Sequence, residues 1–197
     1  MKSRAVLILL IVFSVLPCIG YEEQCREIAI REYPGDPRMQ DYIYRQQLTA
    51  ARYMTTVTDM DARSIALREY PDNFSMQKYV YDTQSSAKRY MASVTDDDVK
   101  SIALREYPDD FSMQKYVYDK QSSAKRYMAS VTDSEVKGIA LREYPDDYSM
   151  QKYIYDKQLS AKTYMASMPN DAAKRRATIE YPYDYSMQKY IYDKLRW

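Results

Sequence analysis

The 197-residue sequence contains no histidine, and this absence removes several kinds of chemistry. Without an imidazole the chain cannot build a Ser-His-Asp or Cys-His catalytic pair, and it has no imidazole ligand for zinc or haem. It also lacks the side chain that usually titrates near neutral pH. The sequence therefore gives no support for an enzyme, and we expect no catalytic residue, no cofactor and no metal.

Glycine is scarce as well, with three residues in the whole chain. Phosphate-binding loops need glycine so that the backbone can approach the ligand, and neither GxxxxGK[ST] nor GxGxxG occurs. The spaced aspartate and glycine pattern of a calcium-binding EF-hand loop is also missing. Nucleotide and calcium sites of these kinds are therefore excluded.

The first twenty residues have the layout of a secretory signal peptide. Lys2 and Arg4 precede an apolar run from Ala5 to Leu16, and small residues at positions 18 and 20 precede a cleavage point before Tyr21. The apolar run falls short of the ~20 residues that a membrane-spanning helix needs. We therefore predict residues 1–20 as a signal peptide, and residues 21–197 as a secreted or periplasmic chain with no stable membrane span.

Neither sign of charge is in excess. Removing Lys2 and Arg4 from the 29 basic side chains leaves 27 against 28 acidic ones, a net charge of −1. This balance gives no basic footprint for nucleic acid or anionic lipid, so we expect no nucleic-acid partner. Cleavage would also remove Cys18 and leave Cys25, which either pairs between chains in self-association or serves as a small apolar residue.

What the sequence does contain is abundant tyrosine, 23 residues, in a regular repeat. The Tyr-Pro dipeptide recurs every 37 residues, and the Met-Gln pair keeps the same interval. The Tyr-Pro dipeptides begin at Tyr33, Tyr70, Tyr107, Tyr144 and Tyr181. Residues 21–197 therefore read as a single repeat domain, with repeats at about 21–58, 59–95, 96–132, 133–169 and 170–197, the last truncated.

The third repeat predicts two helices. Thr95 and the three following aspartates supply an N-cap and an acidic first turn for a short helix, which ends before Pro108. A longer helix begins at Phe111, and no stretch alternates like a strand. Its expected core stripe consists of Met113, Tyr116, Val117, Lys120, Ala124, Tyr127 and Met128. The predicted fold is all-α, with tandem 37-residue two-helix repeats that form a short solenoid or an open helical bundle.

The segment REYPDDFSMQKY, from Arg105 to Tyr116, resembles a short module of bacterial proteins of unknown role. The pattern of that module reads roughly E-W-P-x-D-[YF]-x-M-Q-x-Y. Here Tyr107 replaces the tryptophan, and Val117 lies where a cysteine often sits. The resemblance implies small helical modules in bacterial, often exported, proteins, and it carries no active site.

A second stripe, of aromatic and amide side chains, follows each longer helix. Tyrosine and glutamine combine a large contact area with hydrogen-bonding tips, so an exposed stripe would suit a protein or a cell-surface polysaccharide. Alternatively, the stripe is the contact between neighbouring repeats. The candidate binding residues of this Tyr/Gln strip are Phe74, Gln77, Tyr81, Gln84, Phe111, Gln114, Tyr118, Gln121, Tyr148, Gln151, Tyr155 and Gln158.

The leading functional hypothesis is an exported, non-enzymatic helical repeat protein that binds a partner through the Tyr/Gln strip. The alternative is a structural or envelope-matrix protein that self-associates through tyrosine-rich surfaces. Paired acids such as Glu106 and Asp109 can hydrolyse glycosides, but they recur in successive repeats, and helix capping explains the aspartates. Of the repeated tyrosines, we expect only Tyr118 and its equivalents to point away from the core stripe.

Overall fold

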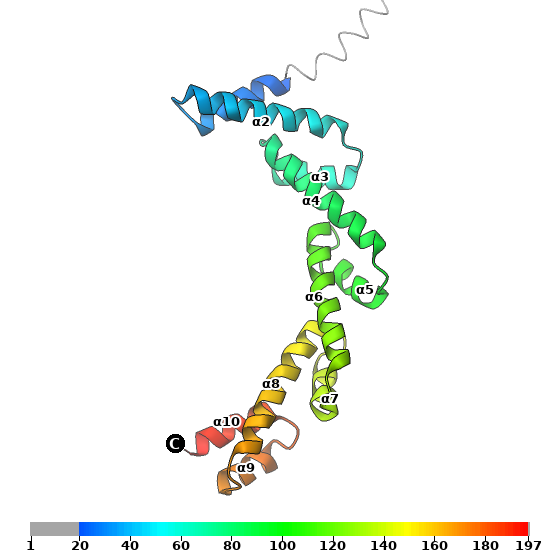
Figure 1. The fold of residues 1–197 in the computed structure, drawn as a ribbon, viewed down its shortest axis with the longest axis vertical. Coiled ribbons are helices and arrows are strands. Elements are labelled where there is room, and N and C mark those ends of the chain that lie inside the picture. The colour runs from blue at the N-terminus through cyan, green and yellow to red at the C-terminus, as the bar shows by residue number, and fades with distance from the viewer. Residues whose placement is uncertain (1–19, 197) are drawn as a thin grey trace, which may run out of the picture. The chain divides into compact units, whose positions relative to one another are not determined.

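The computed structural model describes residues 20–196, so the predicted signal peptide lies outside the described residues except for Gly20. Every regular element in this range is an α-helix, and no strand occurs in it (Figure 1). The first helix covers residues 20–32, and the others are α2 (Pro37–Thr56), α3 (Met60–Glu69), α4 (Phe74–Ser93), α5 (Asp97–Glu106), α6 (Phe111–Ser130), α7 (Ser134–Glu143), α8 (Tyr148–Ser167), α9 (Ala172–Glu180) and α10 (Tyr185–Leu195). The predicted two-helix repeat is confirmed.

Each repeat thus contributes an A helix (20–32, α3, α5, α7 or α9) and a B helix (α2, α4, α6, α8 or α10). The A helices α3, α5, α7 and α9 begin behind a capping aspartate: Asp96 accepts a hydrogen bond from the Val99 N–H at 3.3 Å, and Asp133 accepts one from the Val136 N–H at 3.0 Å. They end one residue before the Tyr-Pro dipeptide, since proline disfavours a helical residue before it. The local sequence therefore sets both ends of α3, α5, α7 and α9.

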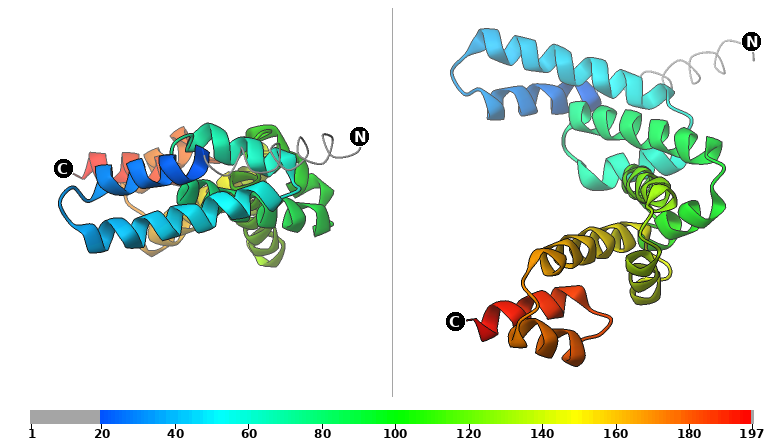
Figure 2. Two further views of the ribbon diagram at one scale, coloured as in Figure 1. Left: turned by 90° about the horizontal axis from the view of Figure 1, so that it is seen from above. Right: turned by 60° about the horizontal axis from the view of Figure 1, so that its bottom comes forward.

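Contacts divide the chain into two compact units, each considered by itself. The first comprises residues 20–92 with 110–112 of the described chain, and the second comprises 93–109 with 113–196. The sequence predicts one domain, but a repeat array has no single core because each repeat contacts only its neighbours. Within the first unit, the helix at 20–32 runs alongside α2 (Figure 2). Within the second, α8 packs on both α7 and α10, and α9 packs on α10.

The core is a series of small clusters rather than one large interior. In the second unit, one cluster joins Met128 of α6 to Val136 and Ile139 of α7 and to Ile154 and Tyr155 of α8. The clusters around Met54 and Met165 likewise combine the end of one B helix with the A and B helices of the next repeat, whereas the first cluster combines 20–32 and α2 with Phe74 at the start of α4. This arrangement agrees with the expectation that a single helix pair cannot bury both of its apolar faces.

The predicted core stripe of the B helix is right in part. Val117, Ala124 and Met128 are buried as expected, but Tyr116 and Lys120 are exposed. Their places in the interior are taken by residues of the Tyr/Gln strip, whose glutamine amides donate hydrogen bonds there. The stripe is therefore rotated on the helix relative to the prediction.

Candidate binding surface

The Tyr/Gln strip lies in the interior, so the prediction of an exposed binding ladder is wrong. Its glutamines are at most 3% exposed, and its tyrosines at positions 81, 118 and 155 are at most 8% exposed. Phe74 is also buried, whereas Phe111 and Tyr148 are half-buried at the start of their helices. The strip is the contact within and between repeats, the alternative that the sequence left open.

The first glutamine of the strip closes the corner between the two helices of its own repeat. Gln151 Nε2 donates to the carbonyl oxygens of Tyr144, at 2.7 Å, and Pro145, at 3.1 Å. These carbonyls follow the end of the A helix, where no intrahelical donor is available. Gln77, Gln114 and Gln188 make the same bond to the tyrosine of their own Tyr-Pro dipeptide at 2.7 Å.

The second glutamine joins one B helix to the next, and we call this contact the glutamine clamp. Gln121 Nε2 donates to the Asp147 carboxylate at 2.9 Å, while Gln121 Oε1 accepts from the Ser149 N–H at 3.0 Å. The clamp satisfies a backbone donor in the first turn of α8 that has no intrahelical partner. The same pair of bonds links Gln47 to Asn73 and Ser75, and Gln158 to Asp184 and Ser186.

The clamp also affects ionisation of the capping carboxylate. Burial alone would raise the pKa of Asp147, but hydrogen bonds from the Met150 N–H, Gln121 and Ser149 outweigh burial and lower the pKa below its usual value. Asp147 therefore stays ionised at the positive end of the α8 dipole.

Buried and half-buried tyrosines complete the contact between repeats. The Tyr155 hydroxyl oxygen accepts a hydrogen bond from the Asp133 N–H at 3.4 Å, and the Tyr155 ring packs edge-on against Tyr127. The Tyr127 hydroxyl donates to Asp156, which also accepts from Lys152 Nζ at 2.6 Å. The bond to Asp156 is the main cause that raises the pKa of Tyr127 to about 12. These tyrosines thus serve packing and are not available to a ligand.

A different set of tyrosines faces solvent at a fixed place in every B helix, and we call it the tyrosine row. Its members expose 57–64% of their surface and have no hydrogen-bond partner for their hydroxyl among residues 20–196. They are Tyr42 and Tyr79 in the first unit, and Tyr116, Tyr153 and Tyr190 in the second. The prediction placed these residues in the core stripe, so the sequence analysis missed them as surface candidates.

The row continues along each helix as an exposed stripe, here called the B-helix face. Positions four, seven and ten residues after the row tyrosines of α2, α4, α6 and α8 are also exposed, as is the position four residues after the row tyrosine of α10. In the second unit the face consists of Tyr116, Lys120, Ser123 and Arg126 on α6, Tyr153, Lys157, Ser160 and Thr163 on α8, and Tyr190 with Lys194 on α10. In the first unit it consists of Tyr42, Gln46, Thr49 and Arg52 on α2, and Tyr79, Thr83, Ser86 and Arg89 on α4.

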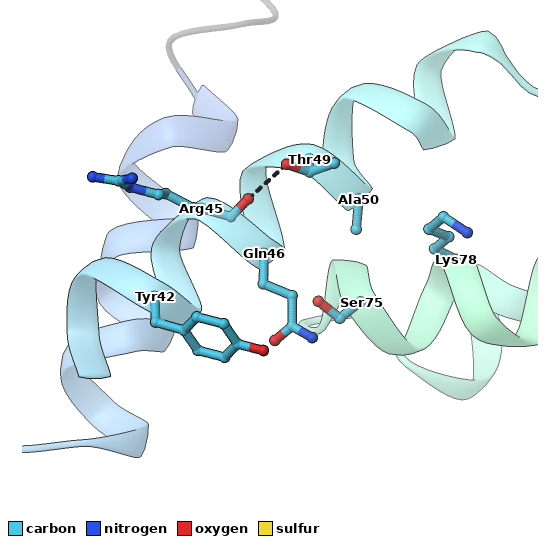
Figure 3. A pocket seen from close by; sticks show the side chains of 7 residues that line it. All are labelled: Tyr42, Arg45, Gln46, Thr49, Ala50, Ser75 and Lys78. Carbon is cyan, nitrogen blue, oxygen red and sulfur yellow. Dashed lines mark hydrogen bonds between the residues drawn. The ribbon is translucent and has the colours of Figure 1, made fainter. Parts of the chain in front are cut away.

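A groove of about 530 Å³ adjoins the row in the first unit (Figure 3). Its α2 side is formed by Tyr42, Arg45, Gln46, Thr49 and Ala50, and its α4 side by Ser75 and Lys78. The Tyr42 hydroxyl and the Gln46 amide point towards one another there (Figure 3). The Ser75 hydroxyl is buried without a hydrogen-bond partner among the described residues. The groove therefore combines an aromatic edge with several hydrogen-bonding groups.

Cys25, in contrast, is part of the core. Its side chain is 0% exposed and packs in a cluster with Ile28, Ala29 and Ala51. Burial, with the nearby Glu22, raises the pKa of its thiol to about 11. Of the two alternatives that the sequence left open for Cys25, the buried position fits a small apolar residue and does not fit a disulfide between chains.

Among residues 20–196, no helix is long and apolar enough to cross a membrane. No protein-family model, no curated protein and no solved structure matches the chain. The resemblance of the Arg105–Tyr116 segment to a bacterial module therefore stays a prediction. The class that the structure defines is an all-α tandem-repeat protein.

Proposed function

We propose that the mature chain is an exported, non-enzymatic repeat protein that binds a protein or polysaccharide partner through its B-helix face. The observation that carries this proposal is the tyrosine row. Packing within and between repeats accounts for the buried glutamines and tyrosines, but it does not account for a solvent-exposed tyrosine at the same place in all five repeats. Tyrosine at an exposed site offers a large rigid contact area at low entropic cost, as in binding surfaces.

Comparison of α2 with the other B helices strengthens the proposal. The first repeat differs from its neighbours at most exposed positions of this helix, and only Tyr42 and Arg52 also occur at the matching exposed positions of α4 and α6. The arginine becomes Thr163 in α8, whereas the tyrosine is present in every copy. The exposed surface of α2 therefore differs from that of the other B helices, but the row tyrosine is the same in all of them.

The proposal is tested by capture of partners from surface extracts of the cells that produce the protein. We expect the immobilised variant Tyr116→Ser, Tyr153→Ser, Tyr190→Ser to keep its helical circular dichroism and to lose the partner that the unmodified chain retains. Tyr183→Ser is the matched control, because Tyr183 is 71% exposed but lies outside the row. Equal capture by the row variant and the unmodified chain would contradict the proposal.

A second candidate is a structural protein that self-associates, and exposed leucines on the A helices favour it. Leu67, Leu104 and Leu141 occupy matching positions in three repeats and expose 40–43% of their surface. Sedimentation over a range of concentrations separates the candidates. Species that grow with concentration, and that disappear when the three leucines are changed to glutamine, would favour the structural protein.

A further inference from the structure

We infer that the ligand of the B-helix face is an acidic polysaccharide, an inference that rests on the proposed binding function and names its ligand class. Three features of the face point to a polymer of carboxylated sugars. They are unpaired cations, aromatic platforms at regular intervals, and hydroxyl and amide groups between them.

In the second unit the cations of the face are free, whereas the other lysines of its B helices are not. Lys152 and Lys162 of α8 form ion pairs with Asp156 and with Asp133 and Glu135, at 2.6–2.8 Å. In contrast, the basic groups of the B-helix face in the second unit have no carboxylate within ion-pair distance among residues 20–196, although Arg52 of the first unit pairs with Glu22 at 3.6 Å. These free groups in the second unit are Lys120, Arg126, Lys157 and Lys194.

Charge is segregated between the two helices of the third repeat, although the whole chain is nearly neutral. Helix α6 carries four basic side chains and one acidic side chain. The segment 96–110, which contains α5 and the following corner, carries six acidic and two basic ones. No fully exposed residue of α4, α6 or α8 is acidic. An anionic ligand is therefore attracted to the exposed faces of α6 and α8 and repelled from the acidic segment 96–110.

The row tyrosines recur at 37-residue intervals, and α8, which carries Tyr153, packs on α10, which carries Tyr190. Each ring offers an apolar surface on which a sugar ring can lie, while its hydroxyl remains available for hydrogen bonds. Ser123 and Ser160 lie seven residues after their row tyrosines, on the same stripe. In the first unit, the groove beside Tyr42 places the Gln46 amide, the Ser75 hydroxyl and Lys78 around one space.

Other polyanions fit the face less well. A nucleic-acid surface is typically built from clustered basic residues in a domain of high isoelectric point, whereas this chain has a sequence pI of about 7.6. A membrane-surface helix carries large apolar side chains opposite its charges, but the outward stripe of α6 and α8 consists of tyrosine, lysine, arginine, serine and threonine. An acidic peptide would satisfy the cations, but it would leave the hydroxyl groups and the regular aromatic rings without a specific role.

The test measures the affinity of the mature chain by calorimetry for polygalacturonate, for neutral dextran, and for poly-L-glutamate of matched charge. We expect polygalacturonate to bind at least about tenfold more tightly than either of the other polymers, and its affinity to fall as salt is added. Changing Lys120, Arg126, Lys157 and Lys194 to glutamine should weaken it by about tenfold or more. The matched control changes four exposed arginines of the A helices, Arg31, Arg68, Arg105 and Arg142, to glutamine and should retain binding.

The tyrosine variant of the capture experiment distinguishes sugar recognition from simple charge attraction. We expect this variant to bind polygalacturonate about tenfold more weakly than the unmodified chain and to keep its weak affinity for poly-L-glutamate. Equal binding of polygalacturonate and poly-L-glutamate, with no effect of the tyrosines, would overturn the inference in favour of an acidic protein partner. If dextran binds as tightly as polygalacturonate, the inference that the ligand is acidic is overturned. If no polymer binds but capture still depends on the row, the inference fails and the proposed function stands; if capture is also independent of the row, both fail.

Discussion

Replacement of the clamp residue Gln121 by methionine tests whether the glutamine clamp holds the repeats together. Methionine keeps the length and volume of the side chain but removes both hydrogen bonds, to the Asp147 carboxylate and from the Ser149 N–H. A bond to a charged group contributes about 1.5–3 kcal/mol and a neutral one about 1 kcal/mol. Since Gln121 is 3% exposed, water does not readily replace the two hydrogen bonds. We therefore expect the free energy of unfolding to fall by about 3 kcal/mol.

Urea unfolding followed by circular dichroism measures this loss. With a denaturant dependence of ~2 kcal/mol per molar urea, the midpoint should fall by about 1.5 M. The transition should also broaden, because nearest-neighbour contacts couple the repeats of an array. The matched control is Gln46→Met, the same substitution at an exposed site of α2. Equal midpoints for the two variants would refute the idea that the clamp couples successive B helices.

Three further predictions concern tyrosine and cysteine. Tyr155→Ala should lower the free energy of unfolding in urea by about 3–5 kcal/mol, because it empties a buried site. Tyr153→Ala, two residues away and 57% exposed, should change it by no more than about 0.5 kcal/mol. Similar losses in the two variants would contradict the assignment of the two faces. Folding raises the pKa of Tyr127 from 10.0 to about 12, mainly through its hydrogen bond to Asp156, so its contribution is complete below pH 10 and is lost as the pH rises towards 12. Unfolding midpoints across that range should therefore fall less in Tyr127→Phe than in the unmodified chain, and identical pH profiles would count against this linkage. Cys25 should react with a thiol reagent only after denaturant is added, and rapid labelling of the folded chain would show that its burial is incorrect.

The fold could be predicted because its signals are local and repeated. The 37-residue interval, the aspartates before α3, α5, α7 and α9, and the Tyr-Pro dipeptide after each A helix identify the helices and their ends without any knowledge of tertiary contacts. A period also restricts the possible architectures, since identical pairs must pack in the same manner on one another.

The orientation of the B helices could not be predicted in the same way. Their tyrosines and apolar residues occur on two adjacent stripes, and a rule that places polar side chains outside selects the wrong one. Gln114 and Gln121 are buried because their amides have partners on the Tyr-Pro corner and on the next repeat, respectively. One signal in the sequence indicates that the glutamines are buried. Helix α2 retains Gln40 and Gln47, although most of its exposed residues differ from those of α4.

Differences between the copies also bear on how the chain associates. In the second repeat, the Ser75 N–H donates to the clamp residue Gln47 at 3.1 Å. In the first repeat, Asp36 accepts both from the N–H of Arg38, the residue at the position of Ser75, and from the N–H of Met39, at 3.1 Å each. The first α2 turn is therefore satisfied without a clamp from another repeat.

At the fifth copy, the position of the clamp glutamine is occupied by Leu195, which cannot cap a further helix. The first B helix thus needs no clamp at its start, and the last B helix has no clamp glutamine to offer to a further repeat. Stacking of further molecules through the same contact would bury Leu195 against a helix start that already has its own cap. Self-association, if sedimentation detects it, should therefore depend on the exposed leucines of the A helices and remain unchanged in Leu195→Ser.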